Sequence, residues 1–473
     1  MSTALDPTTT TGDGHGDRHS ETQFRRVLGL PSLVLFGLAY MVPLTVWTTY
    51  GVVVTKTHGF LSTAYVVTTV AMLFTAYSYG RMVVIHPVAG SAYTYASRAF
   101  GRPFGFMVGW ALLLDYNFLP MINYLVIGLY MQDYFPSTPQ ALWIVIGVLL
   151  VTTLNILGVK LLARMNFIFI AAQVVFIAVF VAVTIAKLTG DAGGHSLGAP
   201  FVGSGLNMSL VFAGAAILAL SFLGFDAVST LSEETPDPRR RIPRAIVLCA
   251  LFGGLVYILQ AYLGQLVFPQ WQSLVGREDV ASADVMKFVG GDFLNSFFTA
   301  VYVSSAFACA MASQASVARI LYAMGRDGSL PRPVFGRLHR RFRTPVVANL
   351  VVGAIGLTAL FISLTTVSSM ISFGALAAFS FVNLAVIKTY VVDRGERSPA
   401  GIAKYGLLPF LGFAFTLYLW TQLTRLTFEI GLGWVAVGFL YLLYLTRLFR
   451  RRPPAMYTGD EEADELTSAP VRA

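Results

Sequence analysis

Two carboxylic acids lie inside long apolar stretches of this 473-residue chain. Asp226 stands in the stretch 208–232 and Asp115 in the stretch 104–131. An ionisable side chain at membrane depth is costly and by default marks a functional site facing a cavity. Two buried anions can hold two ammonium groups through charge-assisted hydrogen bonds, which suits a diamine. These residues therefore predict a binding site for an organic cation.

Each acidic residue also has a plainer interpretation. Asp226 could cap a broken helix, and Asp115 could be a hydrogen-bond partner between two helices. Glu233 and Glu234, at the end of the same stretch as Asp226, could meet helix ends and basic loops as part of a gate, or take up protons.

Aromatic rings supply the second half of amine recognition, because ring faces attract cations and pack against methylene groups. The candidates are Tyr40, Trp47, Tyr116, Phe222, Phe225 and Phe307. The alternative is that these rings face lipid or the core, as most aromatic residues of such a chain do.

The composition is that of a polytopic α-helical membrane protein. Hydrophobic residues make up 56% of the chain and charged residues 12%, with a mean hydropathy of +0.68. We expect about twelve spans, and no alternating pattern of a β-barrel is present. The expected spans are 31–54, 61–85, 104–131, 138–157, 163–186, 208–232, 244–268, 293–324, 346–363, 366–387, 405–424 and 430–446.

The loops predict the orientation. Most Lys and Arg residues fall in every second loop. Positively charged loops are preferentially cytoplasmic, so we expect these loops and both termini on the cytoplasmic side of the inner membrane. Topology and anionic lipid explain the net charge of +9, so a nucleic-acid partner is not expected. We expect a transporter domain over 25–452 between disordered tails at 1–24 and 453–473.

The sequence gives little support for an enzymatic function. The six histidines are scattered without metal-ligand spacing, and no phosphate-binding or dinucleotide fingerprint occurs. No metal and no cofactor are expected.

Two spans contain helix breakers. Gly37 and Pro43 fall in the first span and Gly224 in the sixth. Breaks at corresponding places in two halves indicate a transporter built from inverted repeats. The alternative is an ordinary proline kink and a packing glycine.

Three motifs carry a family resemblance. They are PVAGSAYTY at 87–95, SEETPDPRRRIP at 232–243 and YAMGRDGSLP at 322–331. With them the chain resembles the amino acid–polyamine–organocation transporters. The resemblance implies a LeuT-type fold with inverted five-helix repeats at about 31–186 and 208–387 and peripheral helices at 405–446.

A narrower resemblance concerns the putrescine importers of this superfamily. It rests on residues 37–46, 109–123 and 222–226. It implies that Asp226 and Asn117 contact the substrate. Two positions depart from related proteins: Gln173 stands where some bacterial members have a proton-linked lysine, and Thr48 where the putrescine subgroup has an acid.

The first break also bears on the substrate. Amino acid carriers of the superfamily have a glycine-rich break whose free N–H groups hold a carboxylate. Here bulky residues flank Pro43, which has no N–H. We therefore expect a secondary active importer of putrescine or a similar aliphatic amine, coupled to protons and working by alternating access. An amino acid permease and a transporter-like amine sensor are the alternatives, and the oligomeric state stays open.

Overall fold

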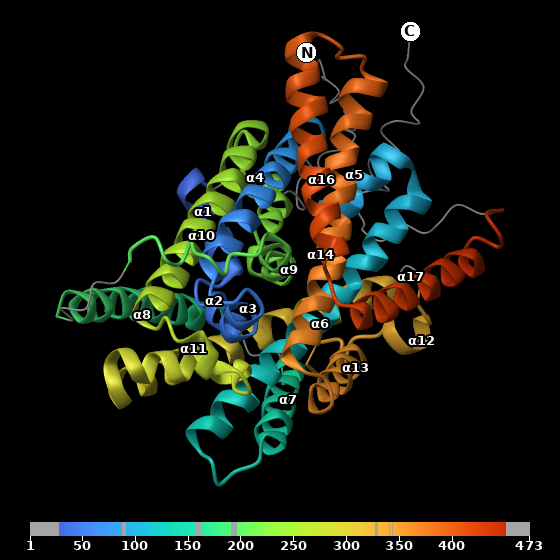
Figure 1. The fold of residues 1–473 in the computed structure, drawn as a ribbon. Coiled ribbons are helices and arrows are strands. Elements are labelled where there is room, and N and C mark those ends of the chain that lie inside the picture. The colour runs from blue at the N-terminus through green and yellow to red at the C-terminus, as the bar shows by residue number, and fades with distance from the viewer. Residues whose placement is uncertain are drawn as a thin grey trace, which may run out of the picture.

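The computed structural model describes residues 28–87, 91–157, 162–190, 196–326, 330–339, 341–342 and 344–450. These residues form helices joined by short loops, and none of them lies in a strand (Figure 1). The two expected tails lie outside the described residues.

The helices follow the order of the expected spans. The α-helices are α1 (Leu30–Met41), α2 (Thr45–Thr48), α3 (Tyr50–Lys56), α4 (Leu61–Ile85), α5 (Ser91–Phe100), α6 (Arg102–Tyr134), α7 (Gln140–Leu157), α8 (Leu162–Gly190), α9 (Met208–Leu218), α10 (Pro238–Val267), α11 (Ala281–Arg326), α12 (Arg332–Phe335), α13 (Val346–Gly356), α14 (Leu364–Val386), α15 (Pro399–Gly401), α16 (Leu408–Thr421) and α17 (Arg425–Leu445). Short 3₁₀ segments are η1 (Ala219–Phe222), η2 (Asp226–Glu234), η3 (Trp271–Leu274), η4 (Glu278–Val280) and η5 (Leu357–Leu360), and η6 (Ile387–Asp393) and η7 (Ile402–Leu407) are π-helical.

The membrane crossings match the expected number. In the described part of the chain, 11 helical segments are long and apolar enough to cross a membrane. The shorter apolar helix Val346–Leu360 stands at the ninth expected span. The structure thus confirms an all-helical, multi-pass membrane protein with about twelve crossings and interrupted first and sixth spans.

Small residues let the central helices approach closely. α10 packs along α4, and α14 along α6. A Cβ on Gly254 of α10 would come within 2.5 Å of the Thr69 side chain of α4. Such contacts are typical of membrane proteins, where helices associate by van der Waals packing rather than by the hydrophobic effect.

The first span is interrupted after Met41. Val42 has a φ of +51°, and the helix resumes only at Thr45. Pro43 lies inside this break, because proline has no N–H to donate and its ring clashes with the preceding helical turn. Gly37 lies within α1 and not at the break, and a Cβ there would meet the Cys249 sulfur at 2.4 Å.

The sixth span is interrupted at Gly224. Between η1 and η2 this residue takes a φ of +126°, a conformation that side-chain-bearing residues rarely adopt. The two breaks touch: a Cβ on Gly224 would lie 2.8 Å from the Tyr40 ring and 2.9 Å from the Met41 nitrogen.

Buried side chains of α10 satisfy the carbonyl groups that the breaks release. The Tyr257 hydroxyl lies 2.7 Å from the carbonyl oxygens of both Met41 and Ser221. The Gln260 amide donates to the Pro43 oxygen at 2.9 Å. One helix therefore holds both breaks in register.

The last helix is attached by a pair of tryptophans. The Trp110 indole donates to the Trp434 carbonyl at 2.9 Å, the Trp434 indole donates to the Trp110 carbonyl at 2.8 Å, and the two rings stack at 4.9 Å. Gly438 lies under the Trp110 ring, where a Cβ would come within 2.2 Å.

We predict that Gly438→Leu loosens α17 from α6. The leucine must displace the Trp110 ring, and overpacking of this kind costs about 1–3 kcal/mol. The thermal transition of the purified protein in detergent, followed by tryptophan fluorescence, should move to lower temperature. Gly433→Leu is the control, because a Cβ at Gly433 of the same helix meets nothing within 4 Å. Equal transitions for the two variants would contradict this attachment.

Candidate functional site

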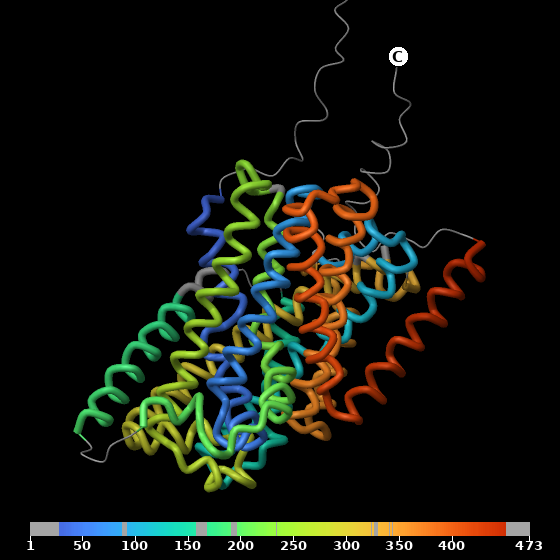
Figure 2. Tube along the Cα trace, turned by 45° about the horizontal axis from the view of Figure 1, so that its top comes forward, coloured from blue at the N-terminus to red at the C-terminus, as the bar shows by residue number. Residues whose placement is uncertain are grey.

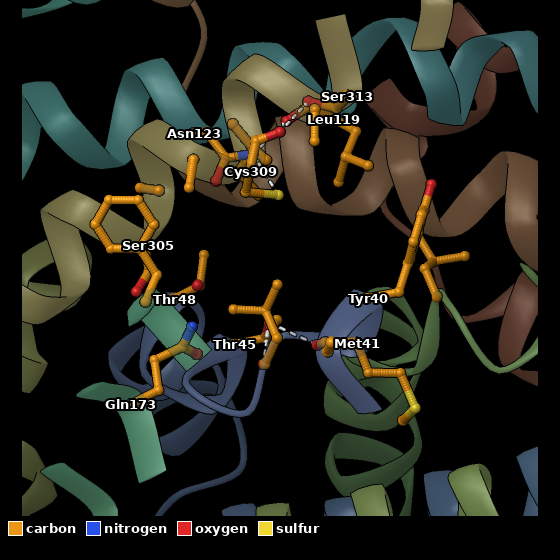
Figure 3. Close-up of a pocket in the computed structure, with 18 of the residues that line it drawn as sticks. Tyr40, Met41, Thr45, Thr48, Leu119, Asn123, Gln173, Ser305, Cys309 and Ser313 are labelled. Carbon is orange, nitrogen blue, oxygen red and sulfur yellow. Dashed lines mark hydrogen bonds between the residues drawn. The ribbon is translucent and has the colours of Figure 1, made fainter. Parts of the chain in front are cut away.

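A cavity of about 180 Å³ lies where the two interrupted spans cross (Figure 3). Five segments line it: the α1 break with α2, the middle of α6, the first half of α8, the region around η1, and α11. Chemically informative lining residues are Tyr40, Thr48, Asn123, Gln173, Tyr302 and Ser305.

The cavity reaches toward one face of the bundle, which we call the α1 face because α1 begins there. Its lining includes Phe36 in the middle of α1, ahead of the break, and Ser316 in the second half of α11. α1 and α11 form the first and eighth crossings and so run in opposite directions. Both segments therefore approach the same face, which lies at the top of Figure 2.

Toward the opposite face, packed side chains close the cavity. Thr48 and Tyr302 share a hydrogen bond of 2.6 Å. Behind them the Trp47 ring stacks on Tyr50 at 5.0 Å, and Phe298 stacks on Tyr302 at 4.9 Å. Trp47 is also held in place, because its indole donates to Gln260 at 2.9 Å.

An ionic bridge lies beyond this aromatic layer. Arg277, in the loop between η3 and η4, donates to Asp133 at the end of α6 at 2.9 Å and to Asp284 at the start of α11 at 2.8 Å. We call this side the Arg277 face. The bridge ties three segments together where the cavity is closed.

Three of the cavity hydroxyl groups donate their hydrogens to main-chain oxygens. Thr45 donates to the Val42 oxygen at 2.7 Å, Ser305 to Val301 at 2.7 Å, and Ser316 to Ala312 at 2.9 Å. Each of these oxygens keeps lone pairs to offer, so each can accept a further hydrogen bond but not donate one.

Asn123 behaves in the same way. Its amide nitrogen donates to the Leu119 oxygen at 2.7 Å and lies 3.4 Å from the Cys309 sulfur. The described lining residues of this cavity include no Lys, Arg, Asp or Glu. The described wall is therefore uncharged and mostly apolar, and the polar atoms that Thr45, Asn123 and Ser305 leave free on it are acceptors.

The two expected carboxylates lie behind this wall. Asp226 is 8% exposed, and its Oδ1 accepts from the Gly224 nitrogen at 3.1 Å, which is a capping contact at the break. Asp115 is 4% exposed, and its Oδ1 has no hydrogen-bond partner among the described residues. It precedes the cavity residue Leu119 by one helical turn on the same face of α6. The two carboxyl groups are close enough to interact electrostatically.

The other expected residues are spread around the crossing. Tyr40 lines the cavity and is 37% exposed. Phe222 is fully buried with its ring 5.6 Å from Tyr257, and Asn117 donates to the Leu113 oxygen at 2.7 Å.

The remaining expected residues are Tyr116, Phe307, Glu233 and Glu234. Tyr116 and Phe307 are half-buried against the core and are not among the residues that line the cavity. The Glu234 main-chain oxygen accepts from the Leu28 nitrogen at 3.2 Å, which joins the end of η2 to the start of α1. The side chain of Glu233 lies outside the described part.

Sequence reasoning missed the uncharged polar residues of the wall. Asn123 and Ser305 are ordinary residues in membrane helices and give no signal by type alone. A spacing signal did exist, because Leu119, Ile122, Asn123 and Val126 follow Asp115 on one helical face.

Comparisons with known proteins agree over most of the chain. The amino acid permease family model matches residues 32–442. The chain is 39% identical over 438 residues to the low-affinity putrescine importer PlaP of Escherichia coli (strain K12), which covers 92% of this chain and 97% of that protein. It is 26% identical over 454 residues to the branched-chain amino acid permease BcaP of Bacillus subtilis (strain 168), covering 90% and 94%.

We predict that Arg277→Gln opens the closed face. Losing an exposed ion pair weakens the closed state by about 1 kcal/mol at most, which corresponds to about a fivefold higher open population. A thiol reagent that cannot cross membranes should therefore modify Cys309, a cavity residue, up to about fivefold faster from the Arg277 face. Reagent added at the α1 face should react at an unchanged rate or more slowly.

The matched control is Arg425→Gln. Arg425 begins α17 and pairs only locally with Glu429, with its side chain 93% exposed. This variant should leave the modification of Cys309 unchanged from both faces. The same acceleration in both variants would rule out a specific role of Arg277 in closure.

Proposed function

Since the chain belongs to the amino acid permease family, we propose that it is a secondary active importer of putrescine or a similar aliphatic amine. The relatives named above are membrane transporters of amines and amino acids rather than enzymes. The finer assignment to amines rests on the cavity, together with the likeness to a putrescine importer.

The observation that carries the proposal is that the described cavity wall has no cationic side chain and that residues such as Thr45 and Asn123 leave only acceptors free on it. An ammonium group has three donors and no acceptor, so it complements the oxygens of these residues. An α-carboxylate would need donors or a positive charge. It would meet neither Lys nor Arg among the described wall residues, and Pro43 removes a backbone donor from the break, so uncharged groups such as the Gln173 amide would have to hold it.

The buried acidic residues also favour a positively charged substrate. Asp115 and Asp226 lie just behind the wall and interact electrostatically. Coulomb interactions are stronger in a medium of low dielectric constant than in water. Two buried acids this close do not readily ionise together, and the single negative charge that the pair can carry would favour a cation in the cavity and disfavour an anion.

The membrane potential would drive such a substrate inward. Each positive charge gains about 2.3 kcal/mol per 100 mV when the inside is negative. A dication gains about twice that. Proton symport would add to this drive, with Asp226, Asp115, Glu233 and Glu234 as candidate proton sites.

The orientation follows from the loop charges. With both termini cytoplasmic in the inner membrane, the α1 face is the cytoplasmic face. The cavity then opens inward, and the Thr48–Tyr302 pair and the Arg277 bridge close the outer side. Alternating access requires the complementary state, in which these contacts separate.

An amino acid permease is the second candidate. The similarity to the branched-chain amino acid permease BcaP favours it, and so does the absence of a charged side chain from the wall. A sensor that binds amine without moving it is the third possibility, and a flux measurement separates it from both transporters.

The test is uptake of labelled putrescine into proteoliposomes with an imposed membrane potential. Spermidine, cadaverine, ornithine, leucine and arginine serve as competitors, with and without a protonophore. We expect the aliphatic amines to compete best. Best competition by leucine or another amino acid would replace the amine assignment, and binding without accumulation would indicate a sensor.

We predict that Asp226→Asn lowers the efficiency of amine uptake by about tenfold or more, because a charge-assisted contribution of about 1.5–3 kcal/mol is lost. Asparagine keeps an oxygen that can accept from the Gly224 nitrogen, so the cap on the break survives. Initial uptake rates at equal amounts of membrane protein give the measurement. Asp292→Asn, an exposed residue near the start of α11, is the control. Unchanged uptake in Asp226→Asn would leave Asp226 with the capping role alone.

A further inference from the structure

The two ends of the cavity differ in their chemistry. Figure 3 shows Gln173, Thr48 and Ser305 together on one side, with Tyr40 across the cavity from them. We call these two sides the amide end and the acidic end. The acidic end takes its name from Asp115, one turn from Leu119, and from the neighbouring Asp226.

At the amide end, Gln173 has a buried side-chain oxygen without a hydrogen-bond partner among the described residues. Its side chain is 4% exposed. Its neighbours are occupied, because Thr48 pairs with Tyr302 and Ser305 donates to the Val301 oxygen. Buried amides in folded proteins are almost always hydrogen-bonded, so an uncommitted amide on a cavity wall points to a ligand.

The amide end has no counter-charge for a cation. Its labelled residues are an amide and hydroxyls, and no carboxylate is among the described residues of the cavity wall. A second ammonium placed there would lose its hydration without gaining an ion pair, which is unfavourable. A neutral group avoids that cost.

A primary amide offers both an acceptor and two donors. A hydroxyl or carboxamide group has the same mixed character, so it can exchange hydrogen bonds in both directions with Gln173. An aliphatic end of a substrate has no hydrogen-bond donor or acceptor. It would therefore leave the buried Gln173 amide unpaired, which lowers the binding affinity.

We propose that Gln173 binds a neutral, hydrogen-bonding end of the substrate. The preferred ligand is then an alkylamine with one ammonium group and a terminal hydroxyl or carboxamide, rather than a symmetric diamine. The ammonium lies at the acidic end and the neutral group at the amide end. This inference rests on the proposed function and narrows its substrate class.

The test compares four ligands of one chain length in purified protein: 4-amino-1-butanol, N-acetylputrescine, putrescine and 1-aminobutane. Affinities come from competition against labelled putrescine in a binding assay. We expect 4-amino-1-butanol or N-acetylputrescine to bind more tightly than putrescine, and 1-aminobutane to bind most weakly.

Two variants locate the effect at Gln173. Gln173→Glu supplies a carboxylate, so it should shift the preference toward putrescine by about tenfold, the size expected for one charge-assisted hydrogen bond. Gln173→Met has a similar size but neither donor nor acceptor. It should remove the advantage of 4-amino-1-butanol over 1-aminobutane, and 1-aminobutane should bind at least as tightly as before, because no buried amide is then left unpaired. Binding of 1-aminobutane also shows that the variant is folded.

The outcomes separate this inference from the function on which it rests. If putrescine binds most tightly and Gln173→Glu does not change the ligand order, the inference is overturned and the amine importer stands. If none of the four amines binds but neutral amino acids do, the proposed function fails and the inference fails with it. A changed order in Gln173→Glu without loss of the hydroxyl preference in Gln173→Met would also overturn it.

Discussion

The whole structure depends on satisfying backbone groups where two helices are interrupted inside the membrane. No water is available there, so each carbonyl released by a break must find a partner within the protein. The Tyr257 hydroxyl lies 2.7 Å from the carbonyl oxygens of Met41 and Ser221, one from each break. Gln260, one turn further along α10, donates a hydrogen bond to the Pro43 oxygen. Without these contacts, the carbonyl groups at the crossing would be left without hydrogen bonds inside the membrane, and the interrupted helices that form the cavity would be destabilised.

The same helix links the breaks to the closed face. Gln260 donates to Pro43 through its nitrogen and accepts from the Trp47 indole through its oxygen. Trp47 belongs to the aromatic layer that closes the cavity. A movement that separates this layer must therefore either carry the Pro43 break with it or exchange the partner of Gln260. The geometry of the break and the state of the closed face are thus physically coupled.

The fold was largely predictable from the sequence, because a membrane imposes long apolar spans and makes Pro43 and Gly224 conspicuous. The exact role of each breaker was not: Gly37 lies inside α1, where its missing side chain admits Cys249. Charge made Asp226 visible, but charge alone does not show whether a carboxylate caps a break or faces a cavity. The wall residues Asn123 and Gln173 are uncharged and give little signal by residue type: spacing from Asp115 marks the helical face of Asn123, and the packed helices show that both residues line the cavity.

If the substrate is an amine, as we propose, there is a physical advantage in placing the carboxylates behind the wall and not in contact with the substrate. A carboxylate exposed in an open cavity is well hydrated, and it also attracts inorganic cations that need no hydrogen-bond geometry. Carboxylates behind the wall still set the sign of the local field, because that field is poorly screened in a medium of low dielectric constant. Oxygens of residues such as Thr45 and Asn123 would then select for directional N–H donors. Since Asp226 also accepts from Gly224, the charge that sets this field is fixed to the same break that forms the cavity.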